Sequence, residues 1–91
     1  MKYVANPVEV EAFKIVATNG YDRETNPAGV QAVQCLWVDL ENGKRLDQIN
    51  SPLVEMTARM WPKVGDYLVI QADGYQYLNP KDVFERKYRP A

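Results

Sequence analysis

Two apolar segments joined by a tight turn, inside residues 62–88, limit the folds open to this chain more than any other feature. The run Tyr67-Leu68-Val69-Ile70 is followed by the turn sequence Ala72-Asp73-Gly74 and then by Tyr75-Gln76-Tyr77-Leu78. Aromatic and β-branched runs bounded by Gly, Pro and Asp are typical of β-strands. The stretch therefore predicts a β-hairpin at the centre of the fold.

Both faces of this hairpin are apolar. A three-residue loop at 72–74 pairs Leu68 with Leu78 and places two groups on opposite faces. One face carries Leu68, Ile70 and Leu78, and the other carries Tyr67, Val69, Tyr75 and Tyr77. Such a sheet is either covered on both sides or presents one side to a partner. Because so thin a domain has little chain to cover both, we expect the tyrosine face to point outward and to join copies of the chain into a homo-oligomer.

A second hairpin is predicted around Asn42-Gly43. Leu36, Val38 and Leu40 share one face of a strand expected over residues 30–41. A three-residue loop over 41–43, with Gly43 in the left-handed conformation, pairs Val38 with Leu46 and keeps apolar residues opposite each other.

The first strand starts near Val8, where apolar and glutamate residues alternate. Phe13 and Ile15 fall on the face that carried the glutamates, which predicts a β-bulge near residues 12–13. The polar stretch over residues 17–29 is a long loop for so small a domain, and it is either functional or without a fixed role.

Two short helices are expected. In the first, Ser51 serves as N-cap with Pro52 at the first helical position, and Leu53, Met56 and Met60 face the sheet. In the second, Asn79 serves as N-cap, Pro80 follows, and the helix runs through Phe84 and Tyr88. The predicted fold is an α+β, mainly β, single domain over residues 1–91, with a bent antiparallel sheet or partial barrel of four or five strands.

The composition removes most catalytic classes. The sequence has no histidine, one cysteine and a net charge of −1. It therefore lacks the usual general base and metal ligand, and it has no bulk attraction to nucleic acid. Cys35 is expected to be a buried strand residue, and Glu9 and Glu11 a solvated strand face rather than a carboxylate pair. We expect no enzyme activity, no cofactor and no metal. The chain start lacks the apolar run of a signal peptide and no run is long enough to span a bilayer, which favours a cytosolic protein.

Two features point to binding. Aromatic residues lie close in sequence to cations, as in protein hot spots and nucleotide-stacking surfaces. The basic tail Arg86-Lys87-Tyr88-Arg89 could contact phosphate or an acidic surface. The alternative for the aromatic set is core packing, and the alternative for the tail is a solvated helix end. The candidate binding residues are Arg59, Trp61, Lys63, Tyr67, Tyr75, Tyr77, Lys81 and Arg86.

Both ends of the chain carry recognisable motifs. They are Asn6-Pro7-Val8-Glu9-Val10-Glu11-Ala12 near the start, and Gly65-Asp66-Tyr67-Leu68-Val69, Gly74-Tyr75-Gln76-Tyr77 and Asp82-Val83-Phe84-Glu85-Arg86-Lys87-Tyr88 near the end. With these motifs the chain resembles a family of small proteins of tailed phages and prophages. It departs from that family at Tyr67, where relatives carry tryptophan, and in the turn before Tyr75. The resemblance implies a phage origin and the host bacterial cytoplasm, and it transfers no catalytic residue.

Three functions follow as hypotheses. The first is a phage-encoded binder of a host protein or small host molecule, plausible as an antagonist of antiviral defence. The second is a virion-associated or assembly protein that uses the same aromatic face for subunit contacts. The third is a weak nucleic-acid binder acting through the basic tail.

Overall fold

The computed structural model describes residues 2–5, 8–19 and 34–90 of the 91-residue chain. The elements are β1 (Lys2–Ala5), β2 (Val8–Thr18), β3 (Trp37–Leu40), β4 (Arg45–Asp47), α1 (Leu53–Arg59), β5 (Tyr67–Ile70), β6 (Gln76–Asn79), α2 (Lys81–Lys87) and β7 (Arg89–Pro90). Most of the loop predicted over 17–29, and the start of the strand predicted over 30–41, lie outside the described residues. None of the helices in the described ranges combines the length and the apolar character needed to cross a membrane.

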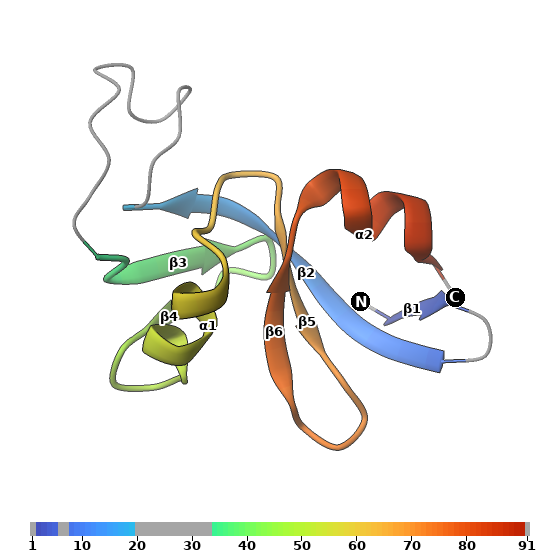
Figure 1. Ribbon diagram of the computed structural model, residues 1–91, viewed down its shortest axis with the longest axis horizontal. Helices are drawn as coiled ribbons and strands as arrows, with labels where there is room; N and C mark the ends of the chain where they lie inside the picture. The colour runs from blue at the N-terminus through green and yellow to red at the C-terminus, as the bar shows by residue number, and fades with distance from the viewer. Residues whose placement is uncertain (1, 6–7, 20–33, 91) are drawn as a thin grey trace.

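The long strand β2 is the centre of a curled antiparallel sheet (Figure 1). Its first half pairs with β1, its middle with β5 and its last residues with β3. The hairpin partners β4 and β6 extend the sheet beyond β3 and β5. The predicted α+β, mainly β fold with two short helices is thus confirmed, and the short strands β1 and β7 add to it.

Both predicted hairpin registers are confirmed. Val38 pairs with Leu46 across a turn in which Gly43 has φ 84°. Leu68 pairs with Leu78 across a turn in which Gly74 has φ 89°. Residues other than glycine are strained at such positive φ values, so each glycine fixes the length of its loop.

The sheet buries both of its faces, each under its own helix. The α1-side core contains Ile15, Cys35, Val38, Leu40, Leu53, Met56, Leu68 and Leu78. The α2-side core contains Val10, Ala12, Tyr67, Val69, Phe84 and Tyr88. Alternate residues of β5 therefore enter different cores, as expected for a strand covered on both sides.

This arrangement corrects the expectation that the tyrosine face points outward. Tyr67 is 4% exposed and Val69 is fully buried, because Phe84 and Tyr88 of the α2 region cover them. On that face Tyr75 keeps a large exposed surface, at 45%. The homo-oligomer stays a prediction, and the surface proposed for it is smaller than expected.

The predicted β-bulge lies at a different place. Pairing between β2 and β5 is regular from Glu11 to Lys14, so residues 12–13 carry no bulge against that strand. The register instead shifts between Ile15 and Ala17, where β2 pairs with β3. The apolar residues change face near Phe13 because β2 serves two cores, and no bulge is needed to explain the pattern.

The face expected for Leu36 is also wrong. Leu36 is 47% exposed, whereas Cys35 is 1% exposed. The side-chain oxygen Oδ1 of Asn19 accepts hydrogen bonds from the backbone N–H groups of both Leu36 and Trp37. Successive N–H groups point in opposite directions in a regular strand, so this shared acceptor bends the chain and breaks the alternation there.

The first helix begins one residue later than predicted. Its N-cap position is Pro52, and no side chain caps it. Ser51 Oγ donates instead to the carbonyl of Asp47, at 2.7 Å. As predicted, Leu53 and Met56 are buried against the sheet.

The second helix is capped by a residue distant in sequence. Asn79 ends β6 and Pro80 occupies the N-cap position, so Asn79 is not the cap that was predicted. Asp66, 4% exposed, instead accepts the backbone N–H of Lys81 with Oδ1 and that of Lys63 with Oδ2, both at 3.0 Å. One carboxylate thus joins the start of α2 to the turn before β5.

Candidate binding groove

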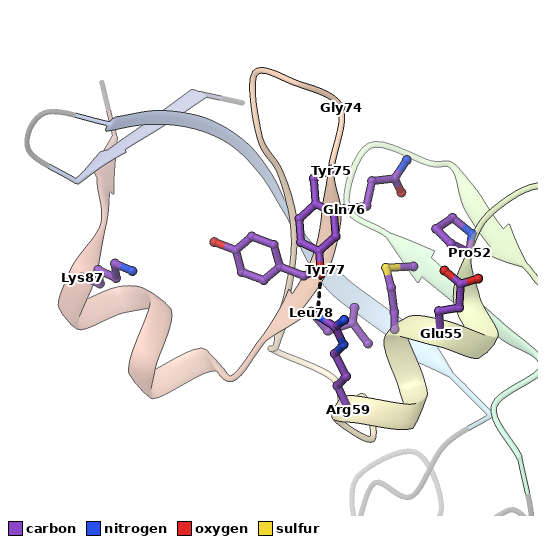
Figure 2. Close-up of a pocket in the computed structure, with 10 residues that line it drawn as sticks. Pro52, Glu55, Arg59, Gly74, Tyr75, Gln76, Tyr77, Leu78 and Lys87 are labelled. Atoms are coloured by element: carbon purple, nitrogen blue, oxygen red, sulfur yellow. Dashed lines mark hydrogen bonds between the residues drawn. The ribbon is translucent and has the colours of Figure 1, made fainter.

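A groove of about 610 Å³ runs between α1 and β6 and reaches the last turn of α2. Its α1 wall is formed by Pro52, Glu55, Met56 and Arg59. Its β6 wall is formed by residues 74–78, and α2 contributes Lys87 (Figure 2). We call this surface the α1–β6 groove.

Tyr75 and Arg59 link the two walls of the groove. Arg59 Nη1 donates to the hydroxyl oxygen of Tyr75 at 2.5 Å, as the dashed line in Figure 2 shows. The Tyr75 ring stacks on that of Tyr77, with centroids 6.0 Å apart and planes at 30°. Two rigid aromatic rings and one cation therefore share the same concave surface, a composition enriched at binding hot spots.

Tyr77 connects the groove to the α2-side core. Its ring is half-buried against that core, and its hydroxyl lies 3.3 Å from the hydroxyl of Tyr88. Burial, with smaller contributions from the Tyr88 hydroxyl, raises the pKa of Tyr77 to about 12, although a hydrogen bond with the Gln71 side chain opposes the shift. The neutral phenol is therefore the form that the fold favours.

This raised pKa predicts a loss of stability in alkaline solution. In the unfolded chain the Tyr77 phenol ionises with its ordinary pKa of 10, whereas in the folded chain its pKa is about 12. The contribution of Tyr77 is thus fully present below pH 10 and is lost as the pH rises through that interval. We expect the unfolding free energy from urea titrations to fall more steeply across this interval in the wild type than in Tyr77→Phe. Parallel curves would contradict the assignment.

Two of the predicted site residues belong to the core. Tyr67 stacks on Phe84 with centroids 4.0 Å apart, and its hydroxyl donates to Glu85 Oε2 at 2.8 Å. Trp61 packs against the α1-side core. Its buried Nε1 has no hydrogen-bond partner within the described part of the chain. For these two aromatics the core-packing alternative is correct.

Three predicted cations lie outside the groove. Lys81 Nζ forms an ion pair with Glu85 at 2.9 Å on the surface of α2. Arg86 Nε donates to the carbonyl of Asp82 on the same helix, and Lys63 is exposed in the turn before β5. The structure therefore brings together Arg59, Tyr75 and Tyr77, and it leaves the other five predicted residues apart.

The basic tail lies partly on the helix and partly in the sheet, and Arg86 and Lys87 are exposed in the last turn of α2, as the solvated-helix-end alternative expects. α2 stops at Lys87, Tyr88 is buried at 8% exposure, and Arg89 pairs with Val4 of β1. Lys87 is the tail residue that lines the groove.

Groove residues absent from the predicted site come from both walls and from α2, and they are Pro52, Glu55, Met56, Gly74, Gln76, Leu78 and Lys87. Glu55 and Arg59 are four residues apart, so they share one side of a helix whose apolar stripe faces the sheet. That spacing could have placed Glu55 at the rim beside the predicted Arg59. Gln76 carries no local signal, and Lys87 was indicated only as part of the basic tail, because the proximity of the two residues depends on how β6 and α2 fold together.

Cys35 has the surroundings of a packing residue. Its thiol lies 3.6 Å from Thr18 Oγ1 in the α1-side core. Burial raises the pKa of the Cys35 thiol, which keeps it in the poorly nucleophilic protonated form. Of the glutamates weighed as a pair, Glu9 forms an exposed ion pair with Lys2 at 3.6 Å.

Comparison of this chain with protein-family models, with curated proteins and with solved structures finds no match. The α1–β6 groove is therefore described by its own residues. These combine the apolar side chains of Met56 and Leu78, two stacked tyrosines, the cations Arg59 and Lys87, and the carboxylate of Glu55.

Proposed function

We propose that this protein is a small binding module whose working surface is the α1–β6 groove. The observation that carries the proposal is the meeting of Tyr75, Tyr77 and Arg59 in a concavity of about 610 Å³. Ligand sites typically occupy about 300–1,000 Å³ and combine aromatic walls with a few polar groups. The groove has both properties.

The resemblance of the chain ends to tailed-phage proteins supports a more specific form of the proposal. In this form, the protein acts in the host bacterial cytoplasm, where it occupies a host protein or a small host molecule and thereby antagonises a defence. The buried, protonated thiol of Cys35 supports a role in binding rather than catalysis.

The test uses capture from bacterial lysate, with mass spectrometry of bound proteins and small molecules. Tyr75→Ala and Arg59→Glu change the groove, whereas Arg86→Glu reverses the charge of an exposed helical arginine outside it. We expect each groove variant to weaken capture by about tenfold or more, the size of a hot-spot effect. Arg86→Glu should bind as the wild type does. A ligand held equally by all three variants would place the binding surface elsewhere.

A further inference from the structure

The β6 strand has an open edge beside the α1–β6 groove. Among the described strands β6 pairs with β5 alone. The N–H of Gln71 donates to the carbonyl of Tyr75 at 2.9 Å, and Val69 pairs with Tyr77 two residues further on. Hydrogen-bonded pairs alternate along an antiparallel ladder, so Gln76 and Leu78 direct their N–H and C=O groups away from β5.

That open edge faces the concavity. Gln76 and Leu78 both line the groove (Figure 2), and Met56 of α1 lines it as well. Natural proteins usually blunt an exposed edge with lysine, proline or a covering element. The β6 sequence QYLN has none of these residues, and α1 stands beside the edge without filling the space. The backbone groups needed for another strand are thus presented inside a ligand-sized groove.

We propose that the ligand of the groove is an extended peptide segment of a partner protein, which adds to β6 as a further strand. The inference rests on the proposed function, since it names the class of partner for the same groove. Strand addition supplies affinity through main-chain hydrogen bonds and specificity through alternate side chains. At about 3.3 Å per residue, β6 can pair with a segment of four or five residues.

The groove also selects the side chains of that peptide. Alternate residues of an added strand point to opposite faces, so one row meets the α1 wall, where Glu55 and Arg59 are exposed, and the other meets the tyrosine pair. Arg59 ends α1 and Lys87 ends α2, and neither forms an ion pair with the described residues. Arg59 donates to the Tyr75 hydroxyl, and the Lys87 ammonium lies 5.4 Å from the centroid of the Tyr88 ring. With Glu55 as the carboxylate in the lining, these two cations leave the groove with a net positive charge, which favours a peptide that carries an acidic side chain between its apolar positions.

A second copy of the chain fits this surface less well than a peptide. A two-fold pairing of β6 with itself would bring two concave surfaces together, and each would keep its hollow of about 610 Å³. A single extended segment is convex, and it can place its side chains in the hollow while its backbone pairs with β6. The peptide is therefore the occupant that the geometry favours.

The peptide side of the test starts from a random dodecapeptide display library selected against the full chain. We expect selected sequences to share apolar residues at alternate positions and an acidic residue. The best synthetic peptide is then methylated on one backbone nitrogen at a time, and its affinity is measured by fluorescence polarisation. Strand addition requires that methylation at every second residue lowers the peptide's affinity by about tenfold or more, because only those N–H groups face β6.

The protein side uses a matched pair at one position. Gln76→Pro removes the outward N–H while leaving the β5–β6 hydrogen bonds in place, and Gln76→Ala removes only the side chain. We expect about tenfold weaker peptide binding for the proline variant and little change for the alanine variant. Hydrogen exchange on the wild type provides a second measurement that does not depend on the fold of the variants. The amides of Gln76 and Leu78 should be slowed at least tenfold when peptide is bound.

Three outcomes would overturn strand addition. These are a library that yields no peptide, a methylation series without alternation, and Gln76 and Leu78 amides that stay unprotected in the complex. Light scattering that shows a dimer, with both amides already protected in the free protein, would assign the edge to a second copy instead. If Tyr75→Ala and Arg59→Glu weaken the binding of a ligand that does not add as a strand, the groove remains the binding site and only strand addition is rejected. A ligand insensitive to both variants would overturn the groove as well.

Discussion

Replacing Phe84 with alanine is expected to lower the unfolding free energy by about 3–5 kcal/mol, the usual cost of deleting a fully buried aromatic ring. Phe84 is 1% exposed and lies between Tyr67 and Tyr88, with ring centroids 4.0 and 4.8 Å away. Since small domains are stable by only about 5–15 kcal/mol, this loss should leave α2 detached or the chain unfolded at moderate temperature. Urea denaturation followed by circular dichroism measures the change.

The matched control for this variant is Val83→Ala, one residue earlier on the same helix. Val83 is 42% exposed, so its truncation should change stability by no more than about 0.5 kcal/mol. Equal urea midpoints for Phe84→Ala and Val83→Ala would mean that α2 does not cover the α2-side core.

Asp66→Ala is expected to cost about 3 kcal/mol or more. The substitution removes the acceptor for the N–H groups of both Lys63 and Lys81. Hydrogen bonds to charged groups contribute about 1.5–3 kcal/mol each, and a buried donor left without a partner adds a desolvation cost. Thermal and urea unfolding should both show the loss.

Asp73→Ala provides the comparison for Asp66→Ala. Asp73 Oδ1 also accepts one backbone N–H, that of Tyr75 at 3.0 Å, but it does so in an exposed turn. Water can replace this bond, so we expect a cost of only about 0.5–1 kcal/mol. If the two variants lose the same stability, the Asp66 carboxylate does not tie α2 to the turn before β5.

The features that could be predicted from the sequence are those set by neighbouring residues. The loop lengths around Gly43 and Gly74 follow from their ability to adopt positive φ, and each loop length fixes a strand register. The apolar stripe of α1 likewise identifies Leu53 and Met56 as buried.

The features that could not be predicted depend on contacts between distant segments. Asp66 caps a helix fifteen residues away, and nothing in its local sequence distinguishes it from a turn aspartate. The exposure of Leu36 follows from the Asn19 side chain, which lies seventeen residues earlier. The burial of Tyr67 requires α2 to fold back over the sheet. The expectation of an exposed face assumed that the chain was too short to cover it, whereas the seven-residue helix α2 does so.

The candidate site shows the same division. Tyr75 and Tyr77 could be placed on one face because residues two apart in a strand share a face. Their partnership with Arg59 across the groove is tertiary, and so is the separation of Lys63, Lys81 and Arg86 from it. Residue type indicated a binding surface, whereas only the fold shows which members meet.

In a sheet that is apolar on both faces, the burial of hydrophobic side chains does not by itself fix the register of the strands. In a sheet with one wet face, sliding a strand by one residue exposes its whole hydrophobic set, and this penalty enforces the alignment. In β5, the same slip would exchange Leu68 and Val69 between two cores rather than drive either into water. The free-energy cost of a register slip must therefore come from other interactions. The left-handed turn at Gly74 resists the slip at one end of β5, and the hydrogen bonds of the buried Asp66 carboxylate resist it at the other. The alignment of β5 is thus set by backbone geometry and one buried carboxylate rather than by hydrophobicity.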